Sequence, residues 1–146
     1  MHHMNIDQKY IHYSKEILNA RILSQPMVAL ESTVFTHGLP YPQNAELARR
    51  MEDVVRENGA TPATIALLDG SIQVGMEQEQ IDRLIAAKDP VKVSLRDFAT
   101  AITLSKPGGT TVAGTMFAAN KAGIHVFATG GIGGVHREAD LDVSTD

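Results

Sequence analysis

The sequence predicts an α/β protein, with three α/β/α layers built around a largely parallel sheet. Short apolar runs alternate along the chain with segments in which apolar residues recur at helical spacing. Glycine and proline separate most of these runs, which is typical of strands alternating with helices. Of the 146 residues, 43% are hydrophobic and 21% are charged, so the chain can bury a core of ordinary size.

The first part of the chain is predicted to contain one peripheral helix, one strand and one long helix. Residues 1–4 are typical of an expression-tag remnant, and residues 5–25 hold a peripheral helix that ends before Pro26. A strand is expected at 27–30, followed by a loop over 36–42 and a helix from Pro42 to Gly59. The apolar face of this helix is predicted to be Leu47, Ala48, Met51, Val54 and Val55. Two ion pairs are predicted on its solvent-exposed side, Glu46–Arg50 and Glu52–Arg56.

The rest of the chain continues the alternation. We expect a strand at 64–68, a turn at Asp69-Gly70, a short hairpin strand at 72–74 and a second helix around Ile81. A strand at 91–93 precedes a helix that begins after the capping-box pair Ser94 and Asp97. A loop or short strand at 108–112, a helix at 113–122 and a strand at 125–129 follow. With no linker visible, residues 26–146 are predicted to belong to a single α/β domain.

Composition excludes several classes of function. A net charge of −4 leaves no basic surface for nucleic acid or an acidic membrane. The absence of cysteine excludes disulfides and thiolate metal sites, and is consistent with a cytoplasmic location. No secretory signal and no membrane-spanning apolar run is visible in the sequence.

Two residues on predicted strands are candidates for chemistry. Glu31 directly follows an apolar strand, and is either a general acid tuned by partial burial or a salt-bridged or capping carboxylate. Lys92 lies between two valines, and is either an edge-strand side chain in water or a phosphate ligand. Gly108 to Thr111 precede a helix and offer a weak anion-binding signal without the Walker lysine.

The glycine-rich stretch 130–134 leads into a loop with further candidates. His136 stands where a dinucleotide fingerprint would need glycine, which disfavours a nicotinamide enzyme. His136 with Asp140, Asp142 and Asp146 is either a magnesium or manganese site or a solvated acidic loop. His37, beside Gly38, is interpreted as a loop residue. We expect Glu31, Lys92, Val112 and His136 to converge at the carboxyl edge of the sheet.

Six segments in a fixed order resemble the pseudouridine-5′-phosphate glycosidase family, also called pseudouridylate synthase or indigoidine synthase A-like. The resemblance extends from about Pro26 to Asp146. The segments are Ala29-Leu30-Glu31-Ser32-Thr33, residues 37–44, residues 59–66, Lys92-Val93-Ser94 with Arg96-Asp97, Thr110-Thr111-Val112-Ala113 and residues 127–137.

The resemblance implies a manganese-dependent homotrimer of α/β/α subunits that reversibly splits pseudouridine 5′-phosphate into uracil and ribose 5-phosphate. By position, Glu31 matches the proton donor and His136 a histidine near the site. The matching substrate-binding positions are Lys92, Val112, Ser144, Thr145 and Asp146, and Asp142 matches the metal ligand.

The resemblance also predicts a missing part. Family members are about twice as long, and their nucleophilic lysine lies a short way beyond the position that matches Asp146. The resemblance therefore implies an incomplete sheet and an N-terminal portion that is inactive alone. Cleaving a C–C glycosidic bond requires an amine that forms an iminium at C1′ and an acid for the ring oxygen. Lys92, Lys106 and Lys121 lie in other segments. The alternatives are a non-catalytic phosphate-binding or oligomerising remnant and, more weakly, a flavodoxin-type nucleotide-binding domain.

Overall fold

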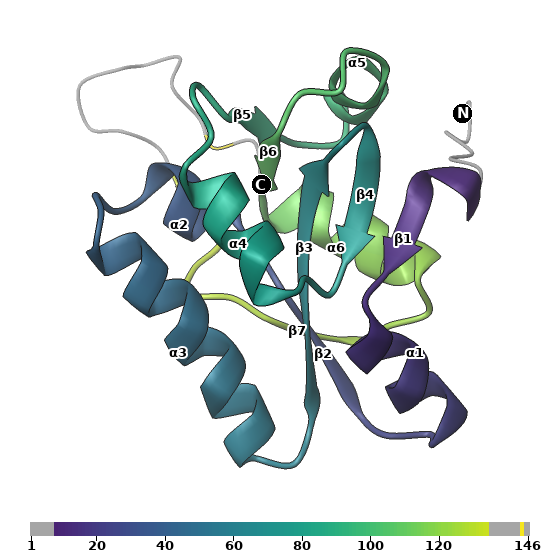
Figure 1. The fold of residues 1–146 in the computed structure, drawn as a ribbon. Coiled ribbons are helices and arrows are strands. Elements are labelled where there is room, and N and C mark those ends of the chain that lie inside the picture. Colours follow the sequence, from purple (N-terminus) through teal and green to yellow (C-terminus); the bar gives the residue numbers. More distant parts are fainter. Residues whose placement is uncertain (1–7, 135–143, 145–146) are drawn as a thin grey trace.

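A computed structural model describes residues 8–134 and residue 144 of the chain. Within them, seven strands form one sheet with helices on both faces (Figure 1). The strands are β1 (Ile11–Tyr13), β2 (Met27–Leu30), β3 (Thr61–Leu68), β4 (Ser71–Val74), β5 (Val91–Val93), β6 (Gly108–Thr110) and β7 (Val126–Ala128). The helices are α1 (Lys15–Ile22), α2 (Thr33–His37), α3 (Gln43–Glu57), α4 (Gln78–Ile85), α5 (Phe98–Thr103) and α6 (Val112–Lys121), with a 3-10 turn η1 (Gln8–Tyr10) before β1.

The core lies on both sides of β3, whose residues are all buried. Ile65 and Leu67 belong to a cluster that includes side chains from α1, α5 and α6. Ala66 and Leu68 belong to a second cluster with side chains from α2, α3 and α4. Because successive strand residues point to opposite faces, this alternation places one helix layer on each side of the sheet. The predicted α/β class is confirmed, and Figure 1 shows α4 in front of the strands and α6 behind them.

The sheet is mixed, with more parallel than antiparallel pairings among the described strands. Its main order is β1-β4-β3-β2-β7, with β6 also beside β3 and β5 beside β6. The pairs β1–β4, β2–β3, β2–β7 and β5–β6 are parallel. The pairs β3–β4 and β3–β6 are antiparallel, so the predicted hairpin after Asp69-Gly70 is confirmed.

The sheet divides along one edge of β3. β2 pairs with the first half of β3, from Thr61 to Thr64. β6 then pairs with Ala66 and Leu67, while β4 occupies the opposite edge of β3 over Ile65–Leu68. β2 therefore leaves β3 just where β6 joins it. Changes of neighbour at the carboxyl ends of strands are where open α/β sheets bind ligands.

Two elements depart from the prediction. The peripheral helix expected within 5–25 is α1, but a short strand, β1, precedes it, because Ile11 is buried and pairs with Ile72 of β4. Helix α2 extends into the loop expected at 36–42 and ends at His37, and its Phe35 is buried in the core. Both elements are short and depend on tertiary packing more than on local propensity.

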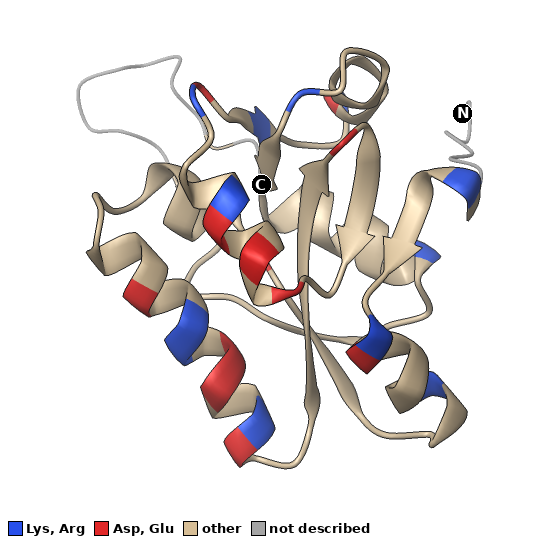
Figure 2. Ribbon diagram, in the orientation of Figure 1, with Lys and Arg blue, Asp and Glu red and all other residues tan. Residues whose placement is uncertain are grey.

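Charged side chains lie mainly on α1, α3, α4 and the loops (Figure 2). The predicted ion pair between Glu52 and Arg56 forms, with 3.0 Å between Oε2 of Glu52 and Nη2 of Arg56. Glu52 is buried, however, and not solvent-exposed as predicted. Arg50 pairs with Glu57 at 2.8 Å instead of with Glu46. None of the helices within the described residues is long and apolar enough to cross a membrane.

Candidate functional site

Glu31 lies at the division of the sheet, one residue after β2. Its exposed fraction is 9%, and its Oε1 lies 2.5 Å from the Thr129 hydroxyl oxygen. The pairing of Leu30 with Ala128 explains this contact, because parallel register carries the next residues of both strands to the same edge. A carboxylate is therefore fixed at the carboxyl ends of β2 and β7.

Glu31 and Lys92 line one cleft. The cleft has a volume of about 430 Å³ and is bounded by Glu31, Thr33, Val34, His37, Gly38, Lys92, Gly130 and Gly131. Lys92 is exposed on β5, whose sole strand partner among the described residues is β6. Both interpretations of Lys92 from the sequence are thus compatible with the structure, since it is an edge-strand lysine in water that also borders the cleft of Glu31.

Buried hydroxyl groups join the residue after Glu31 to the turn before α6. The Ser32 hydroxyl donates to the Ile65 carbonyl at 2.6 Å and accepts from the Thr110 amide at 2.8 Å. The Thr111 hydroxyl caps α6 by accepting from the Gly114 amide at 3.2 Å. Val112, the first residue of α6, is buried and is not among the residues lining the cleft. The Ser32 hydroxyl thus links the segment after β2 to the end of β6, directly before the predicted substrate-binding turn.

Gly108 and Gly109 allow close packing of strand β6. A Cβ at Gly109 would lie 2.1 Å from the Thr36 hydroxyl oxygen, and one at Gly108 would lie 2.6 Å from a methyl carbon of Val93. The weak anion-binding signal in this segment therefore has a packing explanation, because side chains here would push β6 away from α2 and β5.

The structure places His37 in the cleft, which sequence reasoning missed. It is the last residue of α2, not a loop residue. Its Nε2 lies 3.1 Å from the Pro90 carbonyl oxygen and its Nδ1 lies 2.8 Å from the Thr36 hydroxyl oxygen. A carbonyl only accepts, so Nε2 carries a proton and the ring ties α2 to the turn before β5. No feature of the sequence near His37 indicates this contact, since it depends on how α2 meets β5.

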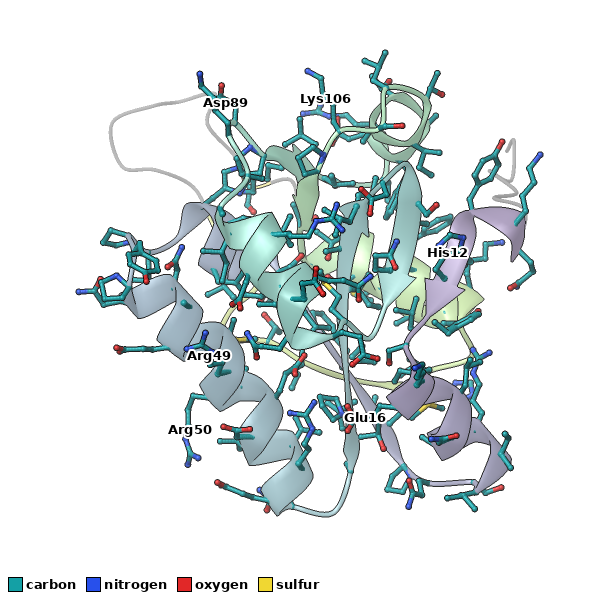
Figure 3. The ribbon with its side chains drawn as sticks, viewed as in Figure 1. His12, Glu16, Arg49, Arg50, Asp89 and Lys106 are labelled. Atoms are coloured by element: carbon teal, nitrogen blue, oxygen red, sulfur yellow. The ribbon has the colours of Figure 1, made fainter. Side chains whose placement is uncertain are left out.

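A second, apolar groove also borders Glu31. It has a volume of about 370 Å³ and is lined by Leu30, Glu31, Val34, Leu47, Arg50, Met51, Val54, Val55, Ala128, Thr129 and Gly130. The prediction that the apolar face of α3 packs on the core is therefore wrong. Of the five residues on that face only Ala48 is buried, and Val54 is 40% exposed. Figure 3 labels Arg50, which projects from the same helix. The residues of α3 that pack on the sheet are small or polar.

The buried face of α3 carries two polar side chains with partners. The Asn44 amide donates to the Phe35 carbonyl at 3.2 Å, and Glu52 accepts from the Thr64 hydroxyl at 2.6 Å. Burial raises the pKa of the Glu52 carboxyl, although Thr64 and Arg56 act in the opposite direction. Glu52 has a raised pKa but does not line the cleft of Glu31, so its role is to stabilise the fold.

The remaining predicted site residues lie mostly outside the described part of the chain. These are His136, Asp140, Asp142, Thr145 and Asp146. Ser144 is described, and its amide donates to the Gly134 carbonyl at 2.8 Å. The described residues contain no group of three or more His, Asp or Glu side chains placed to hold a metal ion. The predicted manganese ligand Asp142 therefore stays a prediction.

Comparison with known proteins identifies the family. Residues 16–146 match the family model described as indigoidine synthase A like protein. Pseudouridine-5′-phosphate glycosidase of Staphylococcus aureus strain MW2 is 52% identical over 141 residues, which is 95% of this chain and 46% of that protein. The enzyme of the same name from Mycoplasmopsis agalactiae is 52% identical over 136 residues, or 92% of this chain and 45% of that protein.

Solved structures agree with this match. An indigoidine synthase A-like protein of Thermotoga maritima has a TM-score of 0.80 at 34% identity, over 99% of this chain and 47% of that one. The prealnumycin C-glycosynthase AlnA, in complex with ribulose 5-phosphate, has a TM-score of 0.78 at 42% identity, over 95% of this chain and 45% of that one. The chain thus spans about half the length of these relatives. Since the family model covers most of its residues, the chain belongs to the indigoidine synthase A-like family.

Proposed function

We propose that this chain is part of a pseudouridine-5′-phosphate glycosidase, in which Glu31 is the proton donor and Lys92 binds the substrate. The observation that carries the proposal is the cleft that Glu31 and Lys92 share, at the point where the sheet divides. Relatives named for this activity are 52% identical to the chain. AlnA, named as a C-glycosynthase and solved with a pentulose phosphate, is consistent with chemistry at a C-glycosidic bond.

The proposed reaction assigns a definite task to Glu31. An amine attacks C1′ of the ribose, the C1′–O4′ bond breaks, and Glu31 gives its proton to O4′. The attached nitrogen loses a proton, and its lone pair then forms a C1′=N⁺ iminium as the C1′–C5 bond breaks. C5 of uracil takes the electron pair of that bond and a proton. Water hydrolyses the iminium to ribose 5-phosphate and returns the amine. Partial burial of Glu31 suits this role, since it limits competition from solvent.

The described residues offer no suitable amine. An attacking lysine must lose its proton, and burial in an apolar site is what favours the neutral form. All six lysines of the sequence lie in the described part, and none of them is buried. We therefore propose that the 146-residue chain alone does not release uracil at a useful rate, because losing the nucleophile removes nearly all of a catalytic unit's effect.

Uracil release tests the activity. We compare two proteins. One is the chain alone. The other, called the extended protein, is this chain followed by the part of the S. aureus relative that the chain does not match. We expect release, and an adduct trapped by borohydride, only from the extended protein. Glu31→Ala should abolish release, and Glu46→Ala, on the exposed side of α3, should leave it unchanged. Turnover by the short chain with an adduct on Lys92 or Lys106 would refute the assignment of the nucleophile.

Binding of ribose 5-phosphate tests Lys92 without any turnover. Loss of one charge-assisted hydrogen bond of about 1.5–3 kcal/mol corresponds to roughly 10- to 150-fold weaker binding. We expect Lys92→Met to show a loss of this size by calorimetry, and Lys88→Met, another exposed lysine before β5, to show none. Equal affinity in the two variants would remove Lys92 from the proposed site.

The proposal also includes a bound manganese ion, a homotrimer and a cytoplasmic location. A carboxylate such as Asp142 is a suitable manganese ligand, and manganese would neutralise negative charge on the substrate when bound. Manganese titration followed by electron paramagnetic resonance should show a site that is lost in Asp142→Asn and kept in Asp89→Asn. Unchanged manganese binding in Asp142→Asn would refute Asp142 as the ligand.

Sedimentation of the extended protein tests the proposed homotrimer, and cell fractionation tests the proposed cytoplasmic location.

A further inference from the structure

The hydroxyl of Thr129 has two possible acceptors, and one of them is Glu31. The Thr129 Oγ1 lies 2.5 Å from Oε1 of Glu31 and 2.8 Å from the carbonyl oxygen of Gly131. It also accepts a hydrogen bond from the Gly131 amide at 3.2 Å. A hydroxyl has one hydrogen to donate, so Thr129 can donate to Glu31 or to Gly131 but not to both at once.

This choice matches the two protonation states of a general acid. An ionised carboxylate only accepts, and Thr129 then donates to Oε1 of Glu31. A protonated carboxyl needs an acceptor for its own hydrogen. Rotation of the Thr129 hydroxyl toward the Gly131 carbonyl frees a lone pair on Oγ1 for that hydrogen. Glu31 therefore keeps a hydrogen-bonded partner before and after it transfers its proton.

The backbone around Thr129 holds the hydroxyl in place. The preceding residue, Ala128, ends β7 and is paired with Leu30, the residue before Glu31. On the other side, the Gly131 amide donates back to Thr129 and closes a short turn. Thr129 and Glu31 thus each lie one residue past the end of a strand, and the pairing of Leu30 with Ala128 fixes the register of these two adjacent strands.

We propose that Thr129 is a positioning residue for Glu31, and that its hydroxyl holds the carboxyl in one rotamer in both protonation states. The inference rests on the proposed function for its catalytic consequence, but the positioning itself is a property of the described residues. Thr129 transfers no proton to the substrate and ends each cycle as it began.

The first test needs no catalysis. In the 146-residue chain labelled with ¹³C-glutamate, side-chain couplings of Glu31 report its rotamer. We expect Thr129→Val to replace the single rotamer by an average, and Thr129→Ser to keep it. Thr103→Val is the matched control, because it removes an exposed hydroxyl on α5. Thermal unfolding of each variant checks that it folds. An unchanged Glu31 rotamer in Thr129→Val would overturn the proposal.

The second test uses uracil release by the extended protein. We expect Thr129→Val to lower kcat about 10- to 150-fold, the loss of one hydrogen bond to a charged group, with KM changed less than about twofold. Thr129→Ser should recover most of kcat. If Thr129→Val is fully active while Glu31→Ala is inactive, the positioning role is wrong and the proposed function stands. If the unsubstituted extended protein releases no uracil but the rotamer changes as expected, the proposed function fails and the positioning stands.

Discussion

The buried carboxylate of Glu52 allows a quantitative test of how this fold is stabilised. Glu52 lies on α3, is 4% exposed, and accepts hydrogen bonds from the Thr64 hydroxyl at 2.6 Å and from Arg56 at 3.0 Å. Arg56 also donates twice to Glu16 of α1, at 3.0 and 2.9 Å, and Figure 3 labels Glu16 between the two helices. Glu52 thereby connects α3 to β3, and Arg56 connects α3 to α1.

Two substitutions separate the effect of the hydrogen bond from that of the charge. Glu52→Ala leaves the buried Thr64 hydroxyl without its acceptor, which costs about 1–3 kcal/mol. Glu52→Gln keeps an acceptor for Thr64, removes the charge and replaces the oxygen that accepts from Arg56 by an NH2 group. Arg56 is 41% exposed and retains Glu16, so losing the charge of Glu52 costs less than about 1 kcal/mol. At neutral pH we expect Ala to be less stable than Gln by about 1–3 kcal/mol.

The pH dependence has a definite sign. Burial raises the pKa of Glu52 above its ordinary value of 4.5, so the folded chain holds this proton more tightly than the unfolded chain. The resulting stabilisation is complete below pH 4.5 and is lost as the pH rises through the raised pKa. Because glutamine does not titrate, the stability of Glu52→Gln relative to the unsubstituted protein should improve as the pH rises.

Urea unfolding at about pH 4 and about pH 8 measures both effects. Glu46→Gln, an exposed acid on the same helix, is the control and should follow the unsubstituted protein at both pH values. Two results would refute the reasoning. One is equal destabilisation by Ala and Gln at Glu52, and the other is a Glu52→Gln variant that loses relative stability between low and high pH.

Two further predictions follow from packing. Gly109→Ala should lower the free energy of unfolding by about 1–3 kcal/mol, because its Cβ would lie 2.1 Å from the Thr36 hydroxyl oxygen. Gly130→Ala, where no atom lies within 4 Å of the new Cβ, should change it by less than about 0.5 kcal/mol. The apolar groove beside α3 and the strand edge at β7 predict self-association of the chain. In sedimentation, Val54→Lys should shift the chain toward monomer, and a monomeric unsubstituted chain at high concentration would contradict this.

The sequence predicts the long, periodic elements of the fold and misses those that depend on partners. The hairpin after Asp69-Gly70 follows from turn chemistry, and Gly59 with a positive φ of 78° follows the long helix as expected. Helix α2 escapes prediction because Thr33, Val34 and Thr36 are β-branched and favour helix weakly. A tertiary contact compensates, since the Thr33 hydroxyl donates to the Gly109 carbonyl at 3.1 Å.

The error on α3 has a different cause. Its periodicity predicts a helix correctly, but hydrophobicity alone selects the wrong face for the core. The face on the sheet carries Asn44 and Glu52, whose polar atoms are satisfied by Phe35 and Thr64. A pattern of residue types does not reveal whether a polar side chain has a buried partner, which decides whether burying it is tolerated. The apolar stripe is then left to line the groove beside Glu31.

The candidate site was predictable only to the extent that strand ends could be read from the sequence. Glu31 follows an apolar run, so its position at the edge of a sheet could be inferred from the sequence alone. Thr129 follows an apolar run in the same way, yet nothing in the sequence states that β7 is the neighbour of β2. Once the register pairs Leu30 with Ala128, the next residues must meet, and the contact of Glu31 with Thr129 is a geometric consequence. In a parallel sheet, the partner of a candidate acid is therefore best sought at the ends of other strands, however far away in sequence.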